Sequence, residues 1–240
     1  GESEPVNIFT DTDAAWLDTN DNIHWLKGGK FFTWVSERDG WRHLYRVSRD
    51  GKQIQPVTTG YFDFINEVGI DTQRGLVYFI ASPNNATQRY LYQASLFGKG
   101  SVKRLSPADQ SGQHSYNISP SGKWAVHTFS NTETPPVIDM VALPSHKPVR
   151  LITDNAQAKK QYEALGLNGK EFFQVRSGNW LLDGWMIKPV DFDSTKKYPV
   201  ILYVYGGPHS QMVRNTYMAE LRRWEMYMAQ RGYLVYVQDN

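Results

Sequence analysis

Short apolar stretches alternate with polar turns from residue 22 to about residue 153, and they recur with a nearly fixed period. A glycine turn precedes an apolar strand pattern at Gly29, Gly75 and Gly122, which are spaced 46 and 47 residues apart. A second strand pattern follows in each copy, at residues 43–47, 90–96 and 137–141, and then a short one that ends at Val57, Leu105 or Ile152. These matching offsets predict three four-stranded units, and the repeat length is typical of the blades of a β-propeller.

The pattern changes from strand to helix after residue 154. Residues 156–164 are good helix formers without a β-branched residue, and Gly166 can end that helix. Strand patterns follow at residues 172–175 and 181–187, and another at 233–237. Before that last strand, four large apolar residues fall on one stripe of a predicted helix: Tyr217, Leu221, Trp224 and Met228.

The stretch from Lys197 to Gln211 contains the clearest candidate site. Residues 200–205 form an unbroken apolar and aromatic run, which predicts a strand buried on both faces, as in a parallel sheet. Gly206, Gly207 and Pro208 end that strand abruptly. Open α/β sheets bind ligands at the carboxyl ends of their strands, so we expect a functional site at this turn.

Composition and charge exclude several classes of protein. The 240 residues contain 26 Lys and Arg against 24 Asp and Glu, a net charge of +2 that does not favour a nucleic acid as partner. Because the chain has no cysteine, it has no disulfide, no thiolate metal site and no cysteine nucleophile. We predict neither a metal ion nor a cofactor. Aromatic residues make up 14% of the chain, which suits a β-rich protein, and we expect Trp25, Trp34, Trp41 and Trp124 to pack within the blades.

The segment from Pro199 to Gln211, with its Tyr-Gly-Gly-Pro core and the following Ser210, resembles the hydrolase domain of the prolyl oligopeptidase family, in particular its dipeptidyl peptidase IV branch. The resemblance implies that the hydroxyl of Tyr205 contributes to an oxyanion hole. It also implies a fold that is mainly β plus α/β. We therefore expect partial propeller blades over residues 1–155, a helical interdomain link over 156–170, and the N-terminal part of an α/β-hydrolase sheet over 171–240.

In that fold a nucleophilic serine lies on a Gly-x-Ser-x-Gly turn, and the sequence contains no such pattern. His209 and Ser210 are adjacent, but a nucleophile and its base rarely face each other from neighbouring positions, so we do not assign them as a catalytic pair. Three blades also cannot close a ring, and they leave apolar faces uncovered. We therefore expect an inactive fragment of a serine peptidase that self-associates.

The resemblance further implies a full-length enzyme that acts on peptides with a penultimate proline or alanine. It implies a homodimer and a location outside the cytoplasm. Two alternatives remain open on the sequence. One is another propeller-bearing serine hydrolase, such as an acylaminoacyl or oligopeptide-cleaving peptidase. The other is a propeller that binds partners without catalysis.

Overall fold

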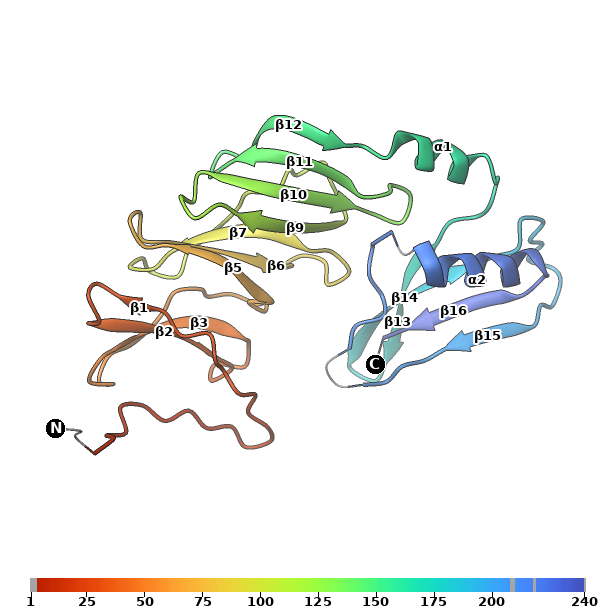
Figure 1. Ribbon diagram of the computed structural model, residues 1–240. Coiled ribbons are helices and arrows are strands. Elements are labelled where there is room, and N and C mark those ends of the chain that lie inside the picture. The colour runs from red at the N-terminus through yellow and green to blue at the C-terminus, as the bar shows by residue number, and fades with distance from the viewer. Residues whose placement is uncertain (1–3, 208–209, 218, 240) are drawn as a thin grey trace.

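The computed structural model describes residues 4–207, 210–217 and 219–239, which form four sheets of four strands each (Figure 1). The first three sheets are antiparallel, with neighbouring strands consecutive in the sequence, and we call them blades one, two and three. Blade one consists of β1 (Trp25–Leu26), β2 (Phe31–Ser36), β3 (His43–Ser48) and β4 (Ile54–Pro56). Blade two consists of β5 (Asn66–Asp71), β6 (Leu76–Ala81), β7 (Tyr90–Ser95) and β8 (Val102–Arg104). Blade three consists of β9 (Gln113–Ile118), β10 (Trp124–Ser130), β11 (Val137–Ala142) and β12 (Lys147–Thr153).

The repeat predicted from the sequence is confirmed for the three strands placed in each copy, whereas the first strand of each blade, β1, β5 or β9, was not located from the sequence. The strands expected after the glycine turns are β2, β6 and β10, and those expected next are β3, β7 and β11. The last strands end at Pro56, Arg104 and Thr153, each one residue from the predicted end. Gly75 and Gly122 both have a φ of +65°, a backbone conformation that glycine adopts without strain.

Alternation along β6 explains why the blades stack. Val77, Phe79 and Ala81 pack toward blade one, in a cluster that includes residues of both blades. Tyr78 and Ile80, on the opposite face, join the core between blades two and three. Blade two is therefore covered on both faces, and Val77, Tyr78, Phe79 and Leu91 in its strands are each at most 1% exposed.

The two end blades differ in how far their outer faces are covered. The outer face of blade three is open, with Trp124 44% and Val126 42% exposed. Blade one is partly covered by the N-terminal segment, because the ring of Phe9 packs 5.4 Å from that of Trp34. The expectation of two bare end faces therefore holds fully for blade three and only in part for blade one.

After blade three the chain continues into α1 (Ala156–Glu163) and then into a fourth sheet (Figure 1). This sheet has the order β13 (Glu171–Ser177), β14 (Trp180–Ile187), β16 (Leu234–Gln238) and β15 (Val200–Tyr203). It is mixed, since β15 and β16 are parallel and the other pairs are antiparallel. Helix α2 (Ala219–Gln230) covers one face, where Trp185, Ile187, Val235 and Val237 form a buried core with Met226.

The prediction of a strand buried on both faces over residues 200–205 is wrong. Strand β15 ends at Tyr203, and Val200 and Leu202 are 59% and 60% exposed. The reason is the position of β15, which is an edge strand of the described sheet and is covered only on the face toward α2. An apolar run reports which residues can be buried, whereas the packing of neighbouring elements decides which of them are.

The predicted apolar stripe of α2 is also wrong in its details. Trp224 is 50% exposed, whereas Met226 and Ala229 are each 4% exposed and face the sheet. Tyr217 precedes the helix, and the side chain of Leu221 lies outside the described residues. Apolar side chains occur on more than one face of this helix, so periodicity alone does not select the buried one. Within the part of the chain that the structure describes, no helix is long and apolar enough to cross a membrane.

Candidate functional site

Tyr205 lies two residues beyond β15, where the chain leaves the sheet, and its side chain is 64% exposed. Gly206 turns the backbone with a φ of +68°. A Cβ at Gly207 would collide with the tyrosine ring, so this glycine allows the ring to lie back over the turn. Among the described residues, the Tyr205 hydroxyl has no hydrogen-bond partner. It is therefore free to donate to a ligand.

Ser210 is held in the same turn, and its surroundings do not resemble those of an activated nucleophile. Its backbone N–H donates to the Gly207 carbonyl at 3.1 Å, and its hydroxyl donates to the Met212 sulfur at 3.8 Å. His209 and Pro208 lie outside the described residues. The expectation that His209 and Ser210 do not form a catalytic pair is therefore not tested for His209.

Residues 211–216, which we call the docking segment, follow this turn and precede α2 in the chain. Val213 is completely buried, and the backbone N–H groups of Met212 and Val213 donate to Asp239 Oδ1 at 2.7 and 3.1 Å. The backbone N–H of Asp239 in turn donates to the Asp183 carbonyl at 3.0 Å. One face of the docking segment is therefore fixed to the ends of β14 and β16.

The other face of the docking segment contacts the blades. Gln211 Nε2 donates to the Ala86 carbonyl at 2.8 Å, and the backbone N–H of Asn215 donates to the Thr87 carbonyl at 2.9 Å. Both carbonyls belong to residues 82–89, which we call the blade-two loop. The backbone N–H of Thr132, in blade three, donates to Asn215 Oδ1 at 3.0 Å. Blades two and three thus hold the segment that follows Tyr205.

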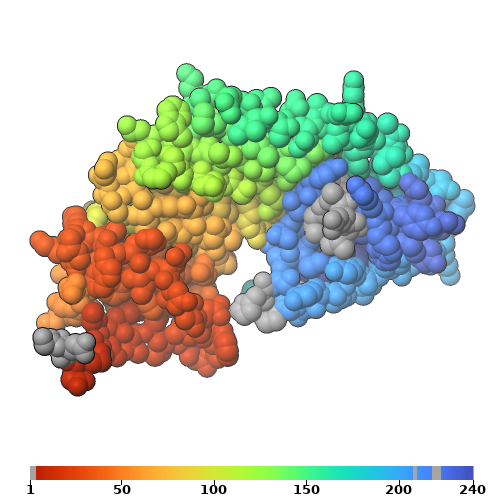
Figure 2. Space-filling view, in the orientation of Figure 1, coloured from red at the N-terminus to blue at the C-terminus, as the bar shows by residue number. Residues whose placement is uncertain are grey.

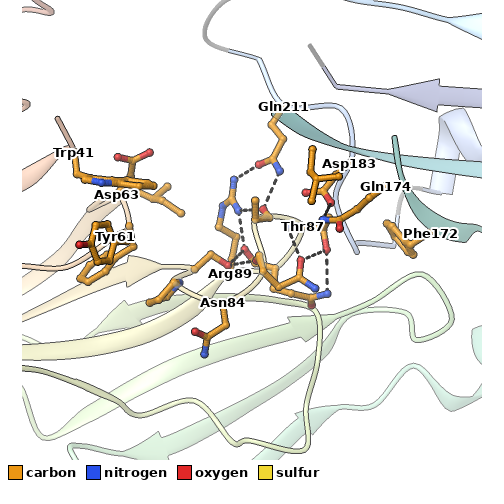
Figure 3. Close-up of a pocket in the computed structure, with 18 of the residues that line it drawn as sticks. Trp41, Tyr61, Asp63, Asn84, Thr87, Arg89, Phe172, Gln174, Asp183 and Gln211 are labelled. Carbon is orange, nitrogen blue, oxygen red and sulfur yellow. Dashed lines mark hydrogen bonds between the residues drawn. The ribbon is translucent and has the colours of Figure 1, made fainter. Parts of the chain in front are cut away.

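A cavity of about 860 Å³ opens between the blades and the fourth sheet beside these contacts (Figure 3). Trp41, Tyr61 and Asp63 line it on the blade-one side, and Phe172 and Asp183 line it on the sheet side. Arg89 and Gln211 lie between the two sides (Figure 3). In the space-filling view, blade one and the C-terminal part stand at two ends of an arc with an opening between them (Figure 2).

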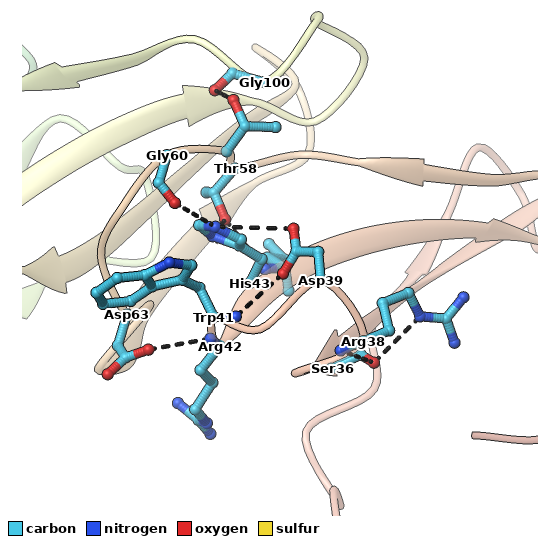
Figure 4. A network of polar contacts seen from close by, with 12 residues as sticks. Ser36, Arg38, Asp39, Trp41, Arg42, His43, Thr58, Gly60, Asp63 and Gly100 are labelled. Atoms are coloured by element: carbon cyan, nitrogen blue, oxygen red, sulfur yellow. Dashed lines mark hydrogen bonds and ion pairs between the residues drawn. The ribbon is translucent and has the colours of Figure 1, made fainter. Parts of the chain in front are cut away.

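Trp41 is placed differently from the sequence-based expectation that it packs within a blade. It is 38% exposed, lines the cavity, and meets Tyr61 edge to face with ring centroids 6.5 Å apart. Hydrogen bonds hold the turn that presents it (Figure 4). The backbone N–H of Trp41 donates to Asp39 Oδ1 at 3.3 Å, and that of Arg42 donates to Asp63 Oδ1 at 3.0 Å.

The cavity combines side chains that suit a peptide ligand. Asp63 and Asp183 bring carboxylates, and Trp41 and Tyr61 bring aromatic surface. Burial lowers the pKa of Arg89, whose guanidinium is engaged with carbonyl oxygens of the blade-two loop. Sites for organic ligands typically pair apolar walls with a few directed polar groups.

A histidine cluster in blade three was not foreseen from the sequence. His114 Nδ1 lies 2.9 Å from His127 Nε2, and His127 Nδ1 lies 2.8 Å from Asp139 Oδ1. Both histidines are 3% exposed, and neither is among the residues that line the cavity. A search of the described residues finds no group of three or more His, Cys, Asp or Glu side chains that could hold a metal ion.

The sequence pointed to the turn beside this cavity, and the role of Tyr205 stays a prediction. Sequence reasoning selected Tyr205 and the glycine turn, because a strand end followed by two glycines is a local signal. It missed Arg89, Trp41 and the cavity. Arg89 and Gln211 are 122 residues apart in the chain, and no local pattern reports that they meet.

Comparison with known proteins gives one consistent result. A family model described as the dipeptidyl peptidase IV (DPP IV) N-terminal region matches residues 2–136. A probable dipeptidyl peptidase 4 of Aspergillus flavus is 27% identical over 98% of this chain and 31% of its own length. Dipeptidyl peptidase 8 of Homo sapiens is 26% identical over 98% of this chain and 30% of its own length.

Among solved structures, the crystal structure of Porphyromonas gingivalis dipeptidyl peptidase 4 superimposes with a TM-score of 0.86 at 28% identity. The match covers 97% of this chain and 32% of that chain. This chain therefore spans about a third of the length of the proteins that it matches. The family match covers more than half of the chain and all but the last two strands of the three-blade repeat. From the repeat, the fold and these matches together, the chain belongs to the dipeptidyl peptidase IV N-terminal region family.

Proposed function

We propose that these 240 residues are part of a serine exopeptidase that releases N-terminal dipeptides, often ending in proline or alanine, from peptide substrates. The observation that carries the proposal is the exposed Tyr205 on its glycine turn, in a chain of this family. The relatives named as dipeptidyl peptidases support the reaction. The cavity beside the docking segment supports a peptide as the ligand.

The domain boundaries follow from the same proposal. Residues 1–155 are propeller blades, residues 156–170 are the link, and residues 171–240 begin an α/β-hydrolase domain. The mixed sheet with α2 on one face is compatible with the start of such a domain. The serine, histidine and acidic residue of the triad would come from chain outside this sequence. We further propose an extracytoplasmic homodimer, as the family resemblance implies.

In this mechanism the serine attacks the substrate carbonyl and the histidine takes up its proton. The carbonyl oxygen gains negative charge as the tetrahedral intermediate forms. The Tyr205 hydroxyl, together with a backbone N–H, donates a hydrogen bond to that oxygen. The hydroxyl contributes mainly in the transition state, because the ground-state carbonyl carries less charge.

The test is Tyr205→Phe in the full-length enzyme. Loss of one oxyanion donor typically lowers kcat by about a hundredfold to a thousandfold, or ~2.7 to 4 kcal/mol of barrier. KM should change far less, and the melting temperature should stay near that of the wild type because the ring remains. A variant that melts normally and keeps more than about a third of wild-type kcat contradicts the oxyanion role, since that loss is under ~1 kcal/mol.

A second test concerns the 240-residue chain itself, which we predict to have no peptidase activity. The reason is the absence of a Gly-x-Ser-x-Gly sequence. A Gly-Pro chromogenic substrate should show no turnover above background in preparations cleared of host peptidases. Turnover that a serine-directed inhibitor blocks would contradict the assignment of the triad to chain outside this sequence.

A further inference from the structure

The position of Tyr205 depends on the residues that follow it in the chain. Gly206 and Gly207 come directly after Tyr205, and two successive glycines restrict backbone direction very little. Edge strand β15 ends at Tyr203, two residues before Tyr205. Catalytic donors must be held within about 0.5 Å of the productive geometry. Some contact beyond the glycines must therefore fix the turn.

Gln211 makes contacts of that kind on the far side of the turn. Its side-chain carbonyl accepts a hydrogen bond from Arg89 Nη2. Its side-chain N–H group donates to the Ala86 carbonyl at 2.8 Å and to the Val213 carbonyl at 3.2 Å. Every polar atom of the Gln211 amide is thus paired, either with blade two or within the docking segment.

Arg89 is itself held rigidly by two blades. Its backbone N–H donates to the Gly112 carbonyl at 3.0 Å, and its carbonyl accepts from the His114 backbone N–H at 3.0 Å, which ties it to blade three. Its Nη1 donates to the carbonyls of Ala86 and Gln88 at 2.8 and 2.6 Å. A planar guanidinium in such a fork loses little freedom per hydrogen bond formed. Because these hydrogen bonds hold the Arg89 side chain and backbone in place, Arg89 Nη2 is directed at Gln211 (Figure 3).

We propose that Arg89 and Gln211 are positioning residues, which transmit the position of blades two and three to the Tyr205 hydroxyl. This inference rests on the proposed function, in which Tyr205 is an oxyanion donor. The blades then do more than enclose the substrate, because they also set the geometry of one catalytic group. Removing the Arg89 to Gln211 contact lets the glycine turn relax while the substrate-binding surfaces remain.

The experiment uses the full-length enzyme and the single variants Arg89→Met and Gln211→Ala. We expect kcat to fall by between about tenfold and a hundredfold in each, as for a misplaced catalytic group, with KM within about twofold of wild type. Arg46→Met is the matched control. Arg46 also donates to a backbone carbonyl between blades, that of Leu96 at 2.8 Å, but it has no contact with the docking segment. This control should keep wild-type kcat.

A double-mutant cycle distinguishes positioning from a loss of stability. If Arg89 acts through the Tyr205 hydroxyl, Arg89→Met in a Tyr205→Phe background should lower kcat by less than about twofold further. A merely structural role would lower kcat by the same factor in both backgrounds. Equal factors, or an Arg46→Met control as slow as Arg89→Met, would overturn the proposal.

The outcome also separates this inference from the proposed function. If Tyr205→Phe lowers kcat while Arg89→Met and Gln211→Ala leave it unchanged, the positioning role is wrong and the oxyanion role stands. If Tyr205→Phe leaves kcat unchanged, both are wrong. Only a slow Tyr205→Phe enzyme with a non-additive Arg89→Met effect supports both.

Discussion

Lys170 and Glu225 form a buried ion pair in the C-terminal part, with Nζ 3.4 Å from Oε2 and side chains 3% and 7% exposed. The ammonium also lies 3.7 Å from the centroid of the Trp185 ring. Glu225→Ala removes the carboxylate that pairs with the buried Lys170 ammonium, so we expect a loss of about 3–5 kcal/mol in the free energy of unfolding. Urea denaturation followed by circular dichroism measures it.

Glu163→Ala is the control at the same scale. Glu163 pairs with Lys159 at 4.0 Å on the surface of α1, where the two side chains are 59% and 44% exposed. Exposed pairs contribute about 0–1 kcal/mol, so this variant should unfold nearly as the wild type does. Equal losses in the free energy of unfolding for Glu225→Ala and Glu163→Ala would show that burial does not strengthen the ion pair of Lys170 with Glu225.

At the scale of an element, blade three carries a titratable cluster inside its sheet. Burial lowers the pKa of His114 and of His127 to about 3. In the unfolded chain each has a pKa near 6.5, so the unfolded state binds more protons between about pH 6.5 and pH 3. The stabilisation is therefore present above pH 6.5 and is lost as the pH falls. We expect the free energy of unfolding to drop by about 1–3 kcal/mol between pH 7.5 and pH 5.5.

Asp139 opposes this trend only at lower pH, since burial raises the pKa of its carboxyl above the usual value of 3.8. The double variant His114→Gln and His127→Gln should reduce the dependence between pH 7.5 and 5.5, and His146, whose pKa burial also lowers, retains part of it. Thr128→Ala, in the same strand as His127, keeps both histidines. It should lower stability without changing the slope of the free energy of unfolding against pH. A double variant with the wild-type slope would show that other groups control the acid sensitivity.

For the whole molecule, the open face of blade three is the feature with the clearest consequence. Trp124 and Val126 are 44% and 42% exposed on this face, and Val149 and Leu151 are 46% and 57% exposed on the edge strand β12. Contiguous apolar surface of this kind drives association in water. We therefore expect sedimentation velocity to show concentration-dependent self-association of the 240-residue chain.

Charged substitutions on that face test the assignment. Trp124→Lys combined with Val126→Lys should shift the population toward monomer. Leu165→Lys changes a residue that is 60% exposed outside blade three, and it should leave the association as it is. A wild-type chain that stays strictly monomeric at high concentration would contradict the prediction.

The sequence by itself determined the repeat length and the positions of three strands in each blade. Strand ends in the three blades were predicted to within one residue, because glycine turns and apolar alternation are properties of neighbouring residues. The same local signal located Tyr205 and the turn that follows it. The link helix was also predicted correctly, since residues 156–164 contain helix formers and α1 covers Ala156–Glu163.

Only the tertiary structure decided which of these elements are covered and which distant residues meet. Leu202 and Trp41 are apolar by sequence, yet both are exposed, because burial depends on what packs against them. The contact of Arg89 with Gln211 depends on how the blades meet the fourth sheet, across 122 residues of chain. Local backbone preferences act within a few residues, whereas burial and interdomain hydrogen bonds are set by the packing of the whole chain.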